Sequence, residues 1–370
     1  MQLAKPFFSE ERIDLITADI EAILASGQFM LGEWCASFEQ KFSGYQNKNH
    51  SIAVNSCTTA LQITLEFLKE RVGSGSVLVP DAGFLSNVST IKWAGLKPIF
   101  VDIKPSTLSF DLDDLNNKIR PDTIGIVWVH LTGWISDDAT QILDFADENG
   151  LFVIEDCAHA QGSTLDSTPA GSLGDAGCFS FFPSKILTTG SGGMITTDDA
   201  ELDEFAREKR IFGRSVSHSG EIVREGNDWF LDEVRSCIGY HQMDDLAFNL
   251  ARRREVAAIY EAKFLSEQKL ETLKGGCLSA FYQYPIFLKN IDTRDRLSQR
   301  LKSDLGIPSK RIYQPLHREA IFSGLGLNEK DFRGAADALD RSLCVPIHAN
   351  VSASDANHIA DCVLISLNRL

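Results

Sequence analysis

Short apolar runs alternate with helical stretches after residue 51, and this alternation constrains the fold more than any other feature of the chain. The apolar runs lie at residues 77–80, 98–103, 124–130, 151–155, 177–182 and 194–197. Between them, residues 60–70 and 139–148 have the apolar spacing of helices. Strands that alternate with helices indicate an α/β fold, with a mostly parallel central sheet and helices on both faces.

The two ends of the chain depart from this pattern. Residues 9–25 have the spacing of an amphipathic helix, with Ser9 as its N-cap and Gly27 at its end. After residue 245, a charged helix over residues 251–264 is followed by short mixed elements, and a last helix begins near Ser354. We therefore expect a large domain over residues 1–245 and a smaller C-terminal α+β domain over residues 246–370.

Charge and cysteine content exclude several classes of protein. The 36 basic and 51 acidic side chains give a net charge of −15, which argues against a nucleic-acid partner. No apolar run reaches the ~18 residues that a membrane helix needs, and the first residues lack the pattern of a signal peptide. The eight cysteines are scattered without metal-binding spacing, which predicts reduced thiols in the cytoplasm and no metal site.

An acidic pair and a lysine follow two of the predicted strands. The segment LFVIEDCAHAQG ends a strand with Glu155 and Asp156, where open α/β sheets bind ligands, although an acid there can also cap the next helix. The segment CFSFFPSKILTTGSGG places Lys185 shortly after another strand. A lysine buried in a sheet crevice loses its preference for the charged form, and its amine can attack a carbonyl carbon.

An acid and a lysine in these positions are the parts that pyridoxal 5′-phosphate (PLP) requires. The lysine holds the cofactor covalently, and the carboxylate keeps the pyridine nitrogen protonated, so that the ring accepts electrons. Ser56, Thr58 and Thr59 precede a predicted helix, whose first N–H groups attract a phosphate, although these residues could be only an N-cap. Ser180 could add a hydroxyl group. Phe84 could stack on the ring or belong to the core.

Several motifs then occur in the order found in one family. They are GQFMLGEWCASFEQKFSGY, NSCTTAL, VHLTGWISD, IEDCAHAQGS, GSLGDAGCFSFFPSKILTTGSGG, QPLH and LCVPIH. With them the chain resembles, over nearly its whole length, the DegT/StrS family of PLP-dependent sugar aminotransferases, which have the aspartate aminotransferase fold (PLP fold type I). The resemblance implies transfer of an amino group from an amino acid, by family habit L-glutamate, to a keto-sugar linked to a nucleotide.

The resemblance also implies roles for individual residues. Lys185 holds PLP and moves the proton, Asp156 pairs with the pyridine nitrogen, and His159 lies beside the phenolic oxygen of the ring. Phe84 stacks on the ring. The implied contacts to the cofactor, several of them to its phosphate, come from Ser56, Thr58, Thr59 and Ser180. In this family a loop of the second subunit completes each site, so a homodimer with shared active sites is expected.

The chain departs from the family's usual glycine, threonine and glutamate at Cys57, Gly83 and Ser191. In GNDWFLDEV, the family's N-x-R motif aligns with residues 228–230, which puts an acid where a phosphate is usually bound. Because a carboxylate would repel the phosphate, we expect Asn227 to make this contact and Asp228 to point away. Phe230 and His317 are expected to contact the substrate.

Three alternatives remain open. The acceptor could be a cyclitol or another keto-compound instead of a sugar. A sugar dehydratase related to this family would have histidine where Lys185 stands. A PLP-binding regulatory protein without turnover would have less need of an electron sink supported by Asp156.

Overall fold

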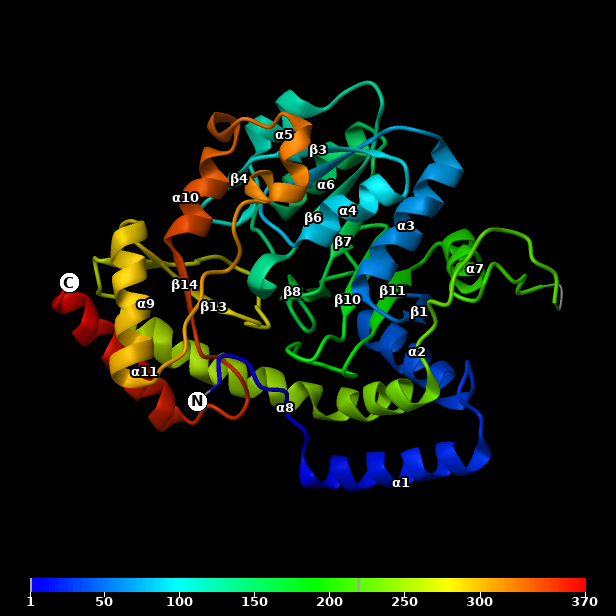
Figure 1. Cartoon of the computed structure of the whole chain (residues 1–370), viewed down its shortest axis with the longest axis horizontal. Helices are drawn as coiled ribbons and strands as arrows, with labels where there is room; N and C mark the ends of the chain where they lie inside the picture. The colour runs from blue at the N-terminus through cyan, green and yellow to red at the C-terminus, as the bar shows by residue number, and fades with distance from the viewer. Residues whose placement is uncertain (1, 218–219) are drawn as a thin grey trace.

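The computed structural model describes residues 2–217 and 220–370, and a seven-stranded sheet forms its centre (Figure 1). The strands of this sheet are β1 (His50–Val54), β2 (Ser76–Pro80), β3 (Lys97–Val101), β6 (Thr123–Val129), β7 (Phe152–Asp156), β10 (Ala176–Ser180) and β11 (Gly193–Thr197). Their order is β1-β11-β10-β7-β6-β2-β3. Strand β11 is antiparallel to both neighbours and the remaining neighbouring pairs are parallel, which confirms the mostly parallel sheet predicted from the sequence.

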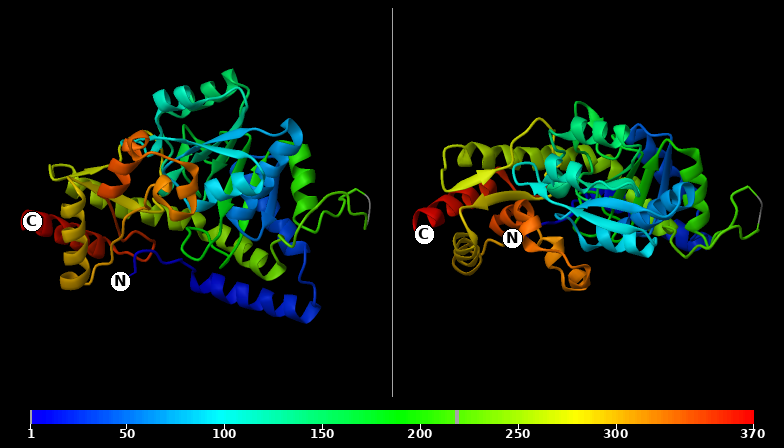
Figure 2. Two further views of the ribbon diagram at one scale, coloured as in Figure 1. Left: turned by 45° about the horizontal axis from the view of Figure 1, so that its top comes forward. Right: turned by 90° about the horizontal axis from the view of Figure 1, so that it is seen from above.

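Helices cover both faces of this sheet (Figure 2). They include α2 (Glu33–Gln46), α3 (Cys57–Val72), α4 (Leu85–Trp93), α5 (Leu112–Lys118), α6 (Ala139–Glu148) and α7 (Ala200–Lys209). In β2, Val77 and Val79 pack into one apolar core with α3, whereas Leu78 packs into a second core with α2 and α6. Successive side chains of a strand point to opposite faces, so a strand covered on both sides is apolar throughout.

The N-terminal helix α1 (Glu10–Ser26) agrees with the helix predicted over residues 9–25. The Ser9 hydroxyl accepts a hydrogen bond from the backbone N–H of Arg12 at 3.4 Å, and Gly27 ends the helix in the left-handed region with φ of 70°. Helix α2 and strand β1 fall where no element was predicted. Phe38 and Phe42 of α2 are buried four residues apart, a spacing that is typical of a helix.

The C-terminal part contains a three-stranded antiparallel sheet covered by helices. Its elements are β12 (Leu270–Thr272), β13 (Tyr284–Leu288), β14 (Ser342–Val345), α9 (Ile291–Leu305), α10 (Arg333–Arg341) and α11 (Ala353–Asn368). Helix α8 (Glu233–Phe264) runs without interruption from the large sheet to this part. Leu246 and Leu250 pack beneath the large sheet, and Val256 and Tyr260 pack in the C-terminal core. We therefore retain the division near residue 245 as a proposal, with α8 shared by both domains.

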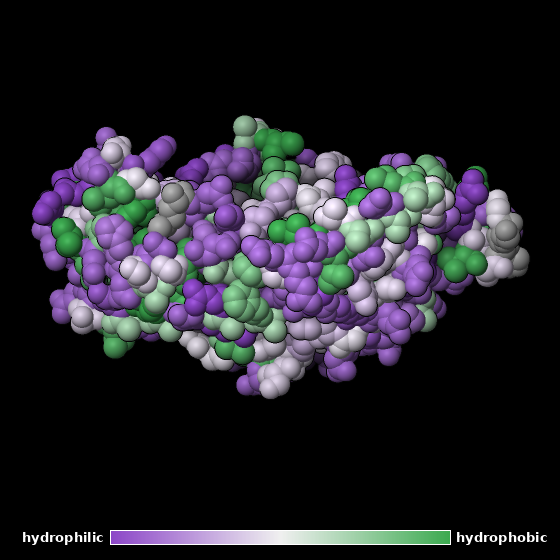
Figure 3. Space-filling view, turned by 90° about the horizontal axis from the view of Figure 1, so that it is seen from below, coloured by the Kyte–Doolittle hydropathy of each residue, from purple (hydrophilic) through white to green (hydrophobic). Residues whose placement is uncertain are grey.

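Shorter elements complete the fold. Two small hairpins pair β4 (Ile103–Lys104) with β5 (Ser109–Phe110) and β8 (Thr164–Leu165) with β9 (Thr168–Pro169). Figure 3 views the molecule from the side of α1, where polar residues predominate and apolar residues occur in separate groups. Within the described ranges, no helix is long and apolar enough to cross a membrane.

Candidate active site

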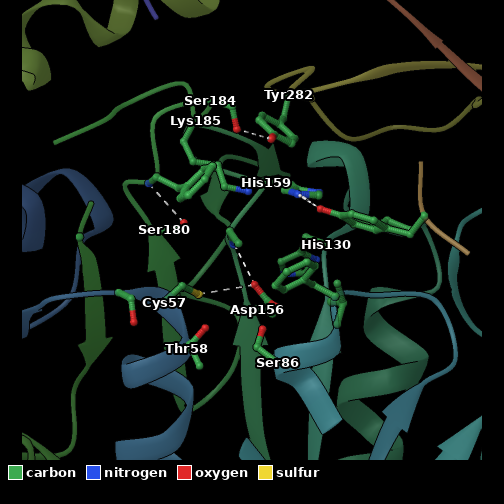
Figure 4. Close-up of a pocket in the computed structure, with 18 of the residues that line it drawn as sticks. Cys57, Thr58, Ser86, His130, Asp156, His159, Ser180, Ser184, Lys185 and Tyr282 are labelled. Carbon is green, nitrogen blue, oxygen red and sulfur yellow. Dashed lines mark hydrogen bonds between the residues drawn. The ribbon is translucent and has the colours of Figure 1, made fainter. Parts of the chain in front are cut away.

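A cavity of about 300 Å³ lies where the parallel strands of the large sheet end. Its wall includes His130 directly after β6, Asp156 at the end of β7 and Ser180 at the end of β10. Lys185 follows β10, and its side chain points into the same space (Figure 4). Because parallel strands have their carboxyl ends at one edge of a sheet, residues distant in sequence meet there.

Lys185 is buried in this cavity, with 8% of its surface exposed. Its backbone N–H donates to the carbonyl of Phe182 at 2.9 Å, which holds the turn after β10. Its ammonium nitrogen lies 4.4 Å from the centre of the Tyr282 ring. Burial lowers the pKa of Lys185 to about 8, although Asp156 favours the charged form. Near neutral pH, part of Lys185 is therefore an uncharged amine that can act as a nucleophile.

Asp156 is 4% exposed and has fixed partners on both carboxylate oxygens. Oδ1 accepts the backbone N–H of Ala158 at 2.9 Å, and Oδ2 accepts the side-chain amide of Asn87 at 2.5 Å. The side-chain oxygen Oδ1 of Asn87 in turn accepts the backbone N–H of Phe84 at 2.8 Å. Asn87 thus orients both Asp156 and the backbone at Phe84. The sequence did not predict this role, because asparagine is common near the start of a helix and gives no sign of a functional site.

Glu155, the other acid of the pair, contacts a loop instead of the cavity. Its carboxylate accepts backbone N–H groups of Gly171, Leu173 and Gly174 at 2.7 to 2.8 Å. It also lies 2.8 Å from Nε2 of His130. Since successive side chains of a strand point to opposite sides, Glu155 anchors a loop while Asp156 lines the cavity.

His159 lies between two tyrosine rings. Its ring is stacked on Tyr282 with 4.2 Å between centroids, and its Nε2 lies 3.3 Å from the hydroxyl of Tyr313. Its Nδ1 accepts the backbone N–H of Thr132 at 3.2 Å. Burial lowers the pKa of His159 well below its usual value, and the nearby positive charges act in the same direction. The ring is therefore neutral at pH 7, and its Nε2–H can donate.

The start of α3 forms another part of the wall. Ser56 caps the helix, because its hydroxyl accepts the backbone N–H of Thr59 at 3.1 Å. Ser56, Thr58 and Ser180 line the cavity, and their contacts to the cofactor stay a prediction. Thr59 does not line it, because its hydroxyl donates to Oδ1 of Asn55 at 2.7 Å. The first turn of a helix has N–H groups without carbonyl partners in the helix, which suits an anion.

A glycine allows this wall to form. A Cβ atom on Gly193, the first residue of β11, would lie 2.4 Å from the carbonyl carbon of Ser56. Strand β11 can therefore approach the start of α3 only without a side chain at this position. The close approach brings Gly192 and Ser191 to the cavity wall beside Ser56.

The structure separates three other predicted residues from this cavity. Asn227 is exposed, and its side-chain oxygen accepts the backbone N–H of Asp228 at 2.8 Å. Phe230 pairs with Val54 through an isolated bridge. His317 is buried with Nδ1 at 2.5 Å from Asp81 and Nε2 at 2.8 Å from Glu329. Within this chain, none of the three lines the cavity, whereas Phe84 lies at its mouth and is 48% exposed.

Residues from the C-terminal part close the cavity, and sequence reasoning missed them. Tyr282, Lys310 and Tyr313 all line it. The Tyr282 hydroxyl lies 2.9 Å from that of Ser184, a residue 98 positions away. The only sequence signal near these residues is the QPLH motif, which begins directly after Tyr313.

The described residues also contain two clusters of side chains with several metal-binding atoms. These clusters are Asp19 with Cys237 and His241, and His130 with Glu155 and Cys157. In each cluster the histidine already forms a hydrogen bond with the carboxylate, at 2.7 and 2.8 Å. These hydrogen bonds account for the short distances within both groups.

The cavity fits PLP. It brings together a buried lysine with a lowered pKa, a buried carboxylate, aromatic and imidazole rings, and a helix start suited to a phosphate. Lys185 would hold the cofactor, Asp156 would face the pyridine nitrogen, and Ser56, Thr58 and Ser180 would surround the phosphate.

The lowered pKa leads to a prediction for the PLP-free protein. We expect covalent capture of PLP to become faster with rising pH between about 7 and 9, because only the uncharged amine of Lys185 reacts. With a pKa of about 8, about half of Lys185 is uncharged at pH 8, compared with roughly 1% or less for an ordinary lysine. Stopped-flow absorbance across this range measures the rate. A rate that continues to rise about tenfold per pH unit above pH 9, toward the ordinary lysine pKa, would contradict the role of burial.

Known proteins resemble the chain in both sequence and fold. The sequence pattern of the DegT/DnrJ/EryC1/StrS aminotransferase family matches residues 11–364. GDP-perosamine synthase of Caulobacter vibrioides is 32% identical over 335 residues, which cover 89% of this chain and 89% of that protein. The dTDP-4-dehydro-2,3,6-trideoxy-D-glucose 4-aminotransferase of Saccharopolyspora spinosa is 30% identical, covering 98% and 95%. The crystal structure of the aminotransferase TlmJ from Streptoalloteichus hindustanus superposes with a TM-score of 0.90 at 29% identity, covering 100% and 99%.

Proposed function

The chain belongs to the DegT/DnrJ/EryC1/StrS aminotransferase family of PLP-dependent transaminases, and we propose that it transfers an amino group from L-glutamate to a nucleotide-linked keto-deoxysugar. The product would be an amino sugar for a polysaccharide such as a lipopolysaccharide O-antigen, or for a natural product. The reaction would take place in the cytoplasm, where the eight buried free cysteines stay reduced.

The observation that carries this proposal is the pairing of Lys185 and Asp156 in one cavity. Two relatives of similar length have names that specify GDP-linked or dTDP-linked sugars, which favours a nucleotide-linked acceptor here. The keto-cyclitol alternative has no comparable support. One relative, of Geobacillus stearothermophilus, is named a pleiotropic regulatory protein and is 31% identical over 92% of this chain, but the pairing of Lys185 with Asp156 favours turnover here. The dehydratase alternative conflicts with Lys185, because such relatives carry histidine at that position.

Four residues, Asp156, Asn87, Lys185 and His159, each have a task in such a reaction. PLP, when bound, supplies a ring that accepts electrons and carries the amino group between the two substrates. Asp156 holds the proton on the pyridine nitrogen, and Asn87 fixes the direction of its carboxylate. The amine of Lys185 takes the proton from the substrate carbon and returns it during transfer. Neutral His159 can donate its Nε2–H toward the oxygen of the ring.

A single-turnover experiment tests the acceptor. The protein is loaded with pyridoxamine phosphate and mixed with a nucleotide-linked keto-sugar, a keto-cyclitol or a simple 2-keto acid. We expect the visible absorbance of the aldehyde form to return fastest with the nucleotide-linked sugar, together with an aminated product by mass spectrometry. Faster return with the keto-cyclitol would contradict the substrate proposed here. Loss of a sugar hydroxyl without amination would indicate a dehydratase.

We also propose a homodimer with shared sites. Large apolar side chains lie exposed at and near the mouth of the cavity, at Phe84, Leu85 and Phe182. Such a group of exposed apolar residues is typical of a surface that is covered by another protein. As the family resemblance implies, the segment around Asn227 would then contact the phosphate end of the neighbouring cavity.

This arrangement predicts different effects for two adjacent residues. Asn227→Ala should weaken PLP binding by about 10-fold, because a neutral side chain that donates to the phosphate is lost. Asp228→Ala, the matched control, should leave PLP affinity unchanged or raise it, since a nearby carboxylate only opposes the phosphate. Equilibrium titration measures both affinities, and light scattering measures the mass. A monomer with normal turnover would refute the shared site, and an unchanged PLP affinity of Asn227→Ala would refute the role of Asn227.

A further inference from the structure

A second lysine lines the cavity and has no role in the chemistry described above. Among the described residues of the cavity wall, only Lys185 and Lys310 carry an ammonium group. The backbone of Lys310 is fixed to β14, since its N–H donates to Cys344 at 3.3 Å and its carbonyl accepts the N–H of Cys344 at 2.7 Å. Its side chain is exposed, and no carboxylate in the described ranges forms an ion pair with it.

The position of Lys310 separates it from the predicted phosphate contacts. Lys310 lines a small hollow beside the cavity together with Ser184 and Tyr282. Figure 4 shows Ser184 and Tyr282 on the far side of Lys185 from Thr58 at the start of α3. The positive charge of Lys310 also acts on Lys185, where it helps to lower the pKa of that amine. Lys310 is thus close to the reacting amine and away from the helix start.

We propose that Lys310 binds the carboxylate that the amino donor carries on its amine-bearing carbon. This inference rests on the proposed function, because it assumes that an α-amino acid is the donor. That carboxylate is one bond from the carbon that must lie beside Lys185. In a nucleotide-linked sugar, by contrast, the sugar ring separates the phosphates from the keto carbon. A cation close to Lys185 therefore suits the donor better than the acceptor.

The surroundings of Lys310 agree with a carboxylate ligand. A carboxylate that leaves water needs charged or hydrogen-bonding partners. Lys310 would supply the charge, and the hydroxyl groups of Ser184 and Tyr282, 2.9 Å apart, would supply hydrogen bonds. Lys310 would then select α-amino acids over amines that lack an adjacent carboxylate.

The test separates the two halves of the reaction. Lys310→Met should raise the L-glutamate concentration for half-maximal conversion of the PLP form by about 10- to 100-fold, as expected for a lost charged contact. The keto-substrate concentration for half-maximal reaction of the pyridoxamine form should stay unchanged, whereas any change of rate through the pKa of Lys185 should appear equally in both halves. Lys310→Arg should restore most of the donor affinity. Lys302→Met, at an exposed position on α9, is the matched control.

Two further measurements extend this test, and the first does not depend on turnover. The amino acid 2-methylglutamate has no hydrogen on its amine-bearing carbon, so it can bind but cannot be converted. Its binding can be followed through the spectrum of the bound cofactor. We expect this binding to weaken in Lys310→Met but not in the Lys302→Met control. Selectivity for L-glutamate over 4-aminobutyrate, whose amine-bearing carbon has no carboxylate, should fall by a similar factor.

The outcomes distinguish this inference from the proposed function. If no amino acid converts the PLP form of the unaltered protein, the proposed function fails. If L-glutamate converts it but Lys310→Met binds the donor within about 2-fold of the Lys302→Met control, the inference is overturned. If Lys310→Met instead raises the concentration of keto-substrate that the pyridoxamine form requires, Lys310 binds the acceptor. This result also overturns the inference.

Discussion

Lys185→Ala is expected to reduce turnover by about 10⁴-fold or more, because it removes both the covalent attachment of PLP and the group that moves the proton. The variant should still bind PLP, since the contacts proposed for Ser56, Thr58 and Asp156 do not involve Lys185. Its absorbance should resemble that of free PLP more than that of the unaltered protein. Rapid-quench assays of amination and an equilibrium titration of PLP measure the two properties.

A second substitution at this position distinguishes the effect of the positive charge from the effect of the nucleophilic amine. Lys185→Arg keeps a positive charge in the cavity but has no amine that attacks a carbonyl at neutral pH. We expect it to be as inactive as Lys185→Ala. A variant that keeps a tenth of the normal rate has an activation barrier only about 1.4 kcal/mol higher than the unaltered protein. If either variant keeps this rate or more, another residue must perform the chemistry.

Asp156→Asn is expected to slow the reaction by at least about 10²-fold, which corresponds to about 2.7 kcal/mol of barrier. The substitution preserves shape but removes the charge that we propose holds the proton on the pyridine nitrogen. It also sets one amide against another, because Asn87 and the N–H of Ala158 both donate to the present carboxylate. Single-turnover rates with L-glutamate measure the effect.

Glu155→Gln is the matched control for this experiment. Glu155 is the adjacent acid, but its carboxylate binds backbone N–H groups of residues 171–174 and His130 instead of lining the cavity. We expect this variant to lower the melting temperature while the folded protein keeps most of its rate. A normal rate in Asp156→Asn would show that another group keeps the ring protonated. A larger loss of rate in Glu155→Gln than in Asp156→Asn would indicate that Glu155, and not Asp156, faces the pyridine nitrogen.

Local patterns predicted most of the large domain. Six of the seven strands of the large sheet, and the flanking α3 and α6, were evident, because a strand buried on both faces has a continuous apolar run. Helix α2 and strand β1 were missed, although Phe38 and Phe42 have helical spacing. The length of α8 was also missed, because Leu246 and Val256 pack against different cores and break its apolar periodicity.

The site was predictable where its residues lie at strand ends. Asp156, Ser180 and Lys185 belong to short motifs whose place at the edge of a parallel sheet follows from topology. Tyr282 and Lys310 were not predicted, because only tertiary packing brings the C-terminal part to this edge. The separation of Thr59 from the cavity depends on a side-chain hydrogen bond to Asn55, which spacing alone does not reveal.

The attachment site of the cofactor tests the account most directly, because every role assigned above depends on it. The PLP-loaded protein is reduced with borohydride, digested and mapped by mass spectrometry. We expect the cofactor mass on the peptide that contains Lys185, in one equivalent per chain. The cofactor mass on Lys310, the other lysine of the cavity wall, or on any further lysine would contradict the account.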